Sequence, residues 1–80
     1  MPTVLREEGF SFRIYVDDHR PPHVHVITNG TEVVIYLGNE DERPSIRERR
    51  GMTDRNAVKA LRLVMDRQEY LLAKWREIHA

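Results

Sequence analysis

The chain has 80 residues, and its 13 basic and 13 acidic residues give a formal net charge of zero. It has no cysteine, which excludes disulfide bridges and thiolate metal sites. Its length fits one small domain over residues 1–80, and no segment approaches the roughly 20 apolar residues of a membrane span. The N-terminal segment has no signal-peptide core, so we expect a full-length cytoplasmic protein without a membrane partner.

The charges are unevenly distributed along the chain. Residues 1–42 carry three basic and eight acidic residues, a net charge of −5, whereas residues 43–80 carry ten and five, a net charge of +5. Solvated surfaces of an arginine-rich protein account for this imbalance. The alternative is a basic second half that meets nucleic acid or an acidic partner.

The first half of the chain has the patterns of a β-meander. Residues 10–17 alternate between apolar and polar side chains, which predicts a strand with one buried face. Residues 23–28 form the next predicted strand, and Asn29-Gly30 predicts a type I′ turn into a third strand over residues 31–38. After a polar loop, residues 45–50 predict a short edge strand or an extended segment.

The second half has the pattern of a helix. From Thr53 the apolar residues recur at spacings of three and four, which predicts one amphipathic helix of about 25 residues through Ala80, capped by Thr53 or Asp54. Three or four antiparallel strands packed by one long C-terminal helix make a two-layer α+β domain. The sheet residues expected beneath the helix are Phe10, Phe12, Ile14, Val16, Val24 and Val26.

Three of the four histidines lie in the segment DHRPPHVHV, residues 18–26. His23 and His25 are two apart on a predicted strand, so both imidazoles point to one sheet face, together with Arg13 and Tyr15. Prolines 21 and 22 restrict the backbone and hold His19 near that face. One helix cannot cover both faces, so we expect the histidine face to be open to solvent, a binding surface or a homodimer interface.

Metal binding is one interpretation of this cluster. Imidazole is a common zinc ligand, and a catalytic zinc site needs three protein ligands and one open position. His23 and His25 supply two ligands for a divalent metal such as zinc, and His19 or Asp18 supplies the third.

Metal-free cleavage of RNA is a second interpretation. His23 and His25 would share the roles of general base and general acid, with His19 close by. Arg13 would stabilise the charged phosphorus centre, and Tyr15 would orient it or donate a proton. A third interpretation is that the histidines are structural and only cap carbonyl groups, stack on tyrosines or fill an interface.

Basic and aromatic residues of the second half also have two interpretations. Arg43, Arg47, Arg49 and Arg50 precede the helix. Arg47, Arg49 and Arg50 either contact RNA phosphates or pair with neighbouring carboxylates on a solvated edge. Trp75 and Tyr70 could stack on bases, but the helical spacing of Trp75 with Leu71 and Leu72 favours a place in the core. His79 is expected at a frayed helix end.

Several of these features occur together in one family. They are the start Pro2-Thr3, the pair Gly9-Phe10, the motif from Asp18 to His25 and the helix sequence Leu71-Leu72-Ala73-Lys74-Trp75. The sequence thereby resembles the small bacterial domain-of-unknown-function family numbered four-one-six-zero, although its charged segment at residues 38–51 departs from the family pattern. The resemblance implies a component of a toxin–antitoxin-like module with a cognate small protein partner and an RNA-directed activity. It also implies His19, Pro21, Pro22, His23 and His25 as the site.

Overall fold

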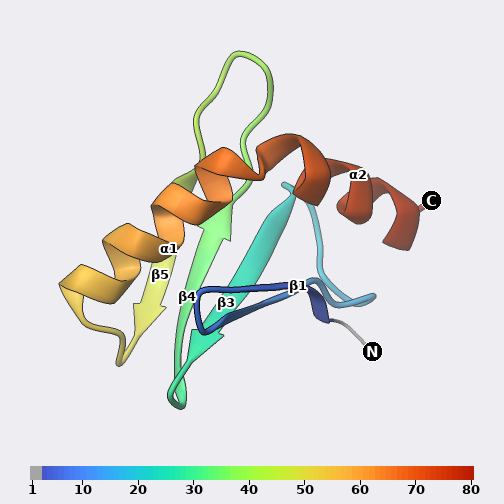
Figure 1. The fold of residues 1–80 in the computed structure, drawn as a ribbon. Helices are drawn as coiled ribbons and strands as arrows, with labels where there is room; N and C mark the ends of the chain where they lie inside the picture. Colours follow the sequence, from blue (N-terminus) through green and yellow to red (C-terminus); the bar gives the residue numbers. More distant parts are fainter. Residues whose placement is uncertain (1–2) are drawn as a thin grey trace.

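The computed structural model describes residues 3–80 and shows one five-stranded antiparallel sheet followed by two helices (Figure 1). The strands lie in chain order: β1 (Thr3–Glu7), β2 (Phe10–Arg13), β3 (His23–Thr28), β4 (Thr31–Tyr36) and β5 (Ser45–Arg50). The helices are α1 (Asp54–Asp66) and α2 (Gln68–Ile78). The predicted α+β class is therefore confirmed, with one or two strands and one helix more than the three or four strands and one helix expected. Within residues 3–80, neither helix is long and apolar enough to cross a membrane.

The second strand is shorter than predicted. It ends at Arg13 rather than at residue 17, because the chain turns away from the sheet. In this turn the Tyr15 N–H donates to the Asp18 carboxylate at 3.0 Å, and the Asp18 N–H donates to the Tyr15 carbonyl at 3.1 Å. Ile14 is still buried, as predicted, but Val16 is 76% exposed. The prediction that Val16 lies in the core was wrong.

The hairpin between β3 and β4 is confirmed. Asn29 and Gly30 both have positive φ, 48° and 75°, as a type I′ turn requires. The two-residue turn fixes the register, so His25 lies opposite Val34 and Ile27 lies opposite Glu32. Because side chains alternate along a strand, Glu32 shares the histidine face and lies diagonally next to His25.

The core lies between one sheet face and α1, which crosses that face (Figure 1). Apolar residues of the three central strands meet the small and aliphatic residues of α1, and each fully buried large side chain contributes about 1.5–3 kcal/mol. Thr53 caps α1 as predicted, since its side-chain oxygen accepts a hydrogen bond from Asn56 N–H at 3.2 Å. The principal core residues are Phe10, Phe12, Val24, Val26, Val33, Ile35, Leu37, Ala57, Ala60, Leu63, Val64, Leu71 and Trp75.

The predicted single helix is interrupted at Arg67, where φ is −113° and ψ is 18°. Gln68 lies directly after the break, and its side-chain amide donates to the carbonyl groups of Leu37, Asn39 and Glu42 at 2.8–3.2 Å. These bonds tie the start of α2 to the connection between β4 and β5. As a result α2 runs past the end of the sheet at which β3 begins (Figure 1).

Candidate functional site

The connection between β2 and β3, residues 14–22, folds over part of the sheet face that α1 does not cover. Asp18 approaches both His23 and His25, and the Tyr15 ring lies edge-on to His25 with 4.8 Å between ring centroids. The His25 side chain is 14% exposed and the His23 side chain 5%. Of the three alternatives expected for this face, the solvent-open one does not hold around the histidines, because the protein covers them with its own loop.

Both imidazoles have their Nδ1 atom fixed by an acceptor. His23 Nδ1 lies 2.9 Å from the Pro21 carbonyl oxygen, and His25 Nδ1 lies 2.6 Å from Glu32 Oε2. A carbonyl or an ionised carboxylate oxygen only accepts hydrogen bonds, so each Nδ1 carries a proton. This leaves Nε2 of both rings as the atom available for chemistry.

The two Nε2 atoms converge on one carboxylate. His23 Nε2 lies 3.4 Å from Asp18 Oδ1, and His25 Nε2 lies 3.3 Å from Asp18 Oδ2. One ligand atom from each of the three residues lies within 4.8 Å of the others. A neutral imidazole with its proton on Nδ1 directs a lone pair from Nε2, and a lone pair facing a carboxylate is repulsive. Either a proton on Nε2 or a cation shared by the three groups resolves this repulsion.

The Asp18 carboxylate is held in its charged form. Burial favours the neutral acid, but the hydrogen bonds from Tyr15 N–H and from His25, together with the charges of His25 and His23, outweigh it. The pKa of Asp18 therefore lies below its ordinary value. At neutral pH this site presents a negative charge to anything placed between the two imidazoles.

The structure brings some of the predicted site residues together and leaves one aside. Arg13 lies directly opposite His25 in the pairing of β2 with β3, and Tyr15 contacts the His25 ring. His19 is exposed and lines the neighbouring hollow, but it does not share the convergence of His23 and His25; its neighbour Asp18 does. Among the described residues, the group that could hold a metal ion is therefore Asp18 with two histidines, rather than three histidines.

Sequence reasoning missed Glu32, the partner of His25 Nδ1. The signal was present in the chain, because the two-residue turn at Asn29-Gly30 sets the register of the hairpin. That register places Ile27 opposite Glu32 and therefore puts Glu32 diagonally across from His25. An acidic residue at this position predicts an imidazole–carboxylate hydrogen bond.

The basic residues before α1 have different surroundings. Arg49 pairs with the Asp54 carboxylate, and Arg50 pairs with Glu48 at 2.8 Å and Glu32 at 3.5 Å. Arg47 instead lines a hollow that Asp18 and His23 also line. Of the arginines predicted to contact nucleic acid, Arg47 shares a hollow with His23, whereas Arg50 reaches Glu32, the partner of His25.

Trp75 and His79 extend the aromatic contacts of the site to the C-terminal helix. Trp75 is 4% exposed, which confirms its predicted place in the core. Its ring lies 5.4 Å from the His23 ring and 3.9 Å from the His79 ring, on which it stacks. His79 Nδ1 also lies 2.9 Å from the Trp75 carbonyl oxygen. Because a carbonyl oxygen only accepts hydrogen bonds, Nδ1 carries a proton and donates it. The prediction of a frayed His79 was wrong.

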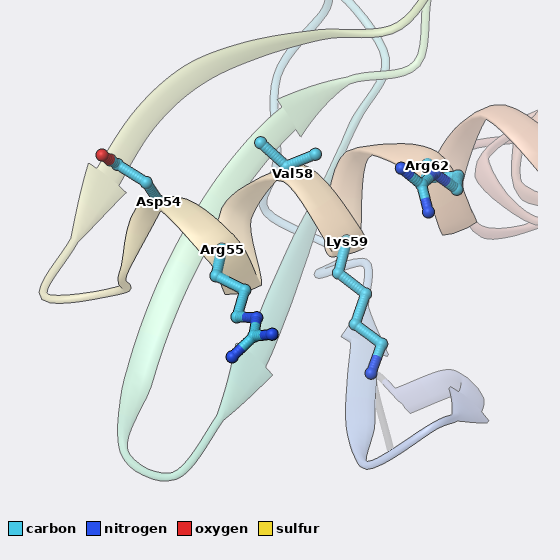
Figure 2. Close-up of a pocket in the computed structure, with 5 residues that line it drawn as sticks. All are labelled: Asp54, Arg55, Val58, Lys59 and Arg62. Carbon is cyan, nitrogen blue, oxygen red and sulfur yellow. The ribbon is translucent and has the colours of Figure 1, made fainter.

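A broader and more open hollow of about 500 Å³ lies along the outer face of α1. Figure 2 shows the residues that line it, with Arg55 and Lys59 extending from the same side of the helix. The hollow contains no histidine, and its one carboxylate, on Asp54, is paired with Arg49. Compared with this hollow, the cluster of Asp18, His23 and His25 is the better candidate for a functional site.

These observations describe a small α+β protein with a histidine–carboxylate cluster beneath a proline-containing loop. A family model described as "Domain of unknown function (DUF4160)" matches residues 9–76, so the chain belongs to this family. The matched range contains the whole cluster and Glu32. Pro2, which belongs to the Pro2-Thr3 pair expected of the family, lies outside the described residues. No curated protein and no solved structure matches the chain.

Proposed function

We propose that the protein binds a divalent transition metal ion, with zinc as the first choice, through a carboxylate oxygen of Asp18 and Nε2 of His23 and His25. The observation that carries this proposal is the fixed orientation of both rings. Their Nδ1–H groups are held by the Pro21 carbonyl and the Glu32 carboxylate, and both Nε2 atoms face one carboxylate. Metal-bound histidines in proteins characteristically have such partners on their other nitrogen.

The chemistry of this ligand set favours an open site over a closed structural one. Three protein ligands leave one position of a tetrahedral zinc ion for water or substrate, and zinc lowers the pKa of bound water to about 7. The fold has its own apolar core, so we expect the protein to fold without metal. Metal would then serve binding or hydrolysis rather than folding.

Calorimetric titration of zinc into metal-free protein tests this function. We expect one site per chain. His25→Ala should weaken zinc binding by at least about 100-fold, because it removes a ligand and losing an outer hydrogen-bond partner alone costs about 10–100-fold. Glu32→Gln, which keeps the shape of the side chain but removes its charge, should fall within that smaller range.

His19→Ala is the matched control, since His19 lies next to Asp18 in the chain but outside the convergence. It should leave zinc affinity unchanged. Absence of zinc binding would contradict the proposal. An equal loss in His19→Ala and His25→Ala would show that the ligand set is wrong, provided that circular dichroism shows both variants to be folded.

A second candidate function is metal-free cleavage of RNA. It is favoured by the two carboxylates that flank His25, Glu32 at Nδ1 and Asp18 at Nε2, because such an arrangement orients an imidazole for proton transfer. The His23 ring, 5.3 Å away, would be the second proton carrier. The protein would then be the RNA-directed member of a toxin–antitoxin-like module, paired with a cognate small protein, and its basic second half would attract phosphates.

RNA incubated with the protein in chelator and in zinc separates the two candidates. Cleavage that persists in chelator and is lost in His25→Ala supports metal-free catalysis. Cleavage that requires zinc supports a metal-dependent hydrolase. Intact RNA under both conditions contradicts the cleavage function and leaves metal binding to be judged by the titration.

A further inference from the structure

The hollow beside the histidine–carboxylate cluster has a volume of about 220 Å³ and lies between the β2–β3 connection and β5. Asp18 and His23 of the cluster form part of its wall. Tyr36, which faces the same side of the sheet because it pairs with His23, adds a hydroxyl-bearing side chain. A group held in this hollow would therefore lie next to the proposed metal site.

Arg47 borders this hollow at an irregularity of β5. Two consecutive residues of β4, Val34 and Ile35, pair with residues of β5 that flank Arg47. Arg47 is thus the extra residue of a β-bulge, a feature that redirects a side chain and occurs often beside active sites. Regular alternation from Ser45 would also have placed Arg47 on the face of Tyr36. The bulge changes the register after Arg47, so that Glu48 lies opposite Val34.

Two guanidinium groups in the wall have no carboxylate partner. Among residues 3–80, neither Arg47 of β5 nor Arg20 of the loop forms an ion pair, whereas Arg49 and Arg50 both do. Arginine presents several donors in a planar fork that matches the oxygens of phosphate. The wall therefore contains donors of the type that recognises an oxyanion, and these donors are free.

The charge of the hollow depends on the metal. Arg20 and Arg47 contribute two positive charges, and Asp17 and Asp18 contribute two negative charges, so the wall has no net charge with neutral histidines. A divalent cation on Asp18 and His23 would give it a net charge of +2. An anion would then be attracted both by the metal and by the two arginines.

We propose that this hollow is an oxyanion subsite that takes a single phosphate group, held by Arg20 and Arg47 with one oxygen directed at the metal. The proposal rests on the metal site proposed above for its net positive charge. At about 220 Å³ the hollow is smaller than the roughly 300–1,000 Å³ of sites that enclose whole small molecules. It fits a phosphate group of a phosphoester, with the remainder of the substrate outside.

The experiment is a calorimetric titration in two steps, with zinc added first and inorganic phosphate second. Arg47→Ala and Arg20→Ala should each weaken phosphate binding roughly 10–100-fold, the loss expected for a hydrogen bond to a charged group, and should leave zinc binding unchanged. Arg62→Ala is the matched control. Arg62 is an exposed arginine on the outer face of α1 and has no ion pair within the described chain (Figure 2). The Arg62→Ala variant should therefore bind phosphate as tightly as the unaltered protein.

The two proposals fail in different ways in this experiment. If zinc binds but phosphate does not, or if Arg62→Ala loses as much affinity as Arg47→Ala, the subsite is wrong and the metal site stands. If zinc does not bind, phosphate is titrated into metal-free protein. Binding that is lost in Arg47→Ala then supports the subsite without its metal, and absence of binding overturns both proposals.

The source of the phosphate group is identified by competition. A short single-stranded RNA that displaces inorganic phosphate, and loses this ability in Arg47→Ala, identifies a phosphodiester of RNA as the occupant. If phosphate binds and the RNA does not compete, the subsite accepts small phosphoesters or free phosphate. Either result is consistent with the subsite and narrows its substrate class.

Discussion

Replacing Trp75 by alanine is expected to lower the free energy of unfolding by about 3–5 kcal/mol, the range for removal of a buried aromatic side chain. Trp75 is 4% exposed and lies between the His23 and His79 rings. Its loss would leave a cavity between α2 and the start of β3, directly behind the candidate site. Urea unfolding followed by circular dichroism measures the change.

Tyr70→Ala is the control for this prediction. Tyr70 is an aromatic residue of the same helix, is 42% exposed, and donates a hydrogen bond to the Val4 carbonyl. Its replacement should cost about 1 kcal/mol, the usual contribution of one hydrogen bond. Equal losses in the two variants would contradict the assignment of Trp75 to the core. Trp75→Phe, which keeps an aromatic ring, should retain most of the stability.

Replacing Gly38 by alanine is the second change with a large expected effect, roughly 2–5 kcal/mol of destabilisation. Gly38 follows β4 with a φ of +68°, a conformation that is strained for residues with a Cβ atom. A Cβ atom there would also meet the Glu42 carbonyl oxygen well inside van der Waals contact, and that oxygen belongs to the backbone. The β4–β5 connection, which holds the start of α2 through Gln68, would have to shift.

Gly30→Ala separates the two causes. Gly30 has a similar φ of +75°, but a Cβ atom at this position would meet nothing within 4 Å. Its replacement should cost only the conformational part, about 1–2 kcal/mol. Thermal unfolding of both variants gives the comparison. If Gly38→Ala is no less stable than Gly30→Ala, the close approach of Glu42 to Gly38 is not maintained in solution.

Much of the fold follows from local sequence patterns. The alternation in residues 23–28 and the turn at Asn29-Gly30 predicted β3, its hairpin and the shared face of His23 and His25. The helical spacing after Thr53 predicted α1 and its cap. In each case the local preference and the tertiary packing agree, so reading the pattern was sufficient.

Other elements depend on contacts that no local pattern contains. The alternation of residues 10–17 continues through Ile14 and Val16, yet the strand ends at Arg13 because Asp18 bonds back to Tyr15. The helix after Thr53 has no Gly or Pro, and its break at Arg67 accompanies the bonds of Gln68 to the β4–β5 connection. Both departures depend on a hydrogen-bond partner outside the pattern. Asp18 follows the alternating segment, and the carbonyl groups that Gln68 contacts lie after β4.

The candidate site divides in the same way. His23 and His25 could be found from their spacing, and Glu32 could have been found from the hairpin register. The choice between Asp18 and His19 as the third member could not, because the two are neighbours in a loop. The path of that loop, fixed by the turn between Tyr15 and Asp18, decides which side chain reaches the imidazoles.

The position of Trp75 has a practical consequence for optical work. It is the single tryptophan of the chain, and its ring lies 5.4 Å from the ring of His23. The protein therefore contains one indole fluorophore, located beside the cluster and shielded from solvent. A proton or an ion arriving at His23 changes the charge next to that fluorophore, so its emission spectrum offers a label-free signal of occupancy in the unaltered chain.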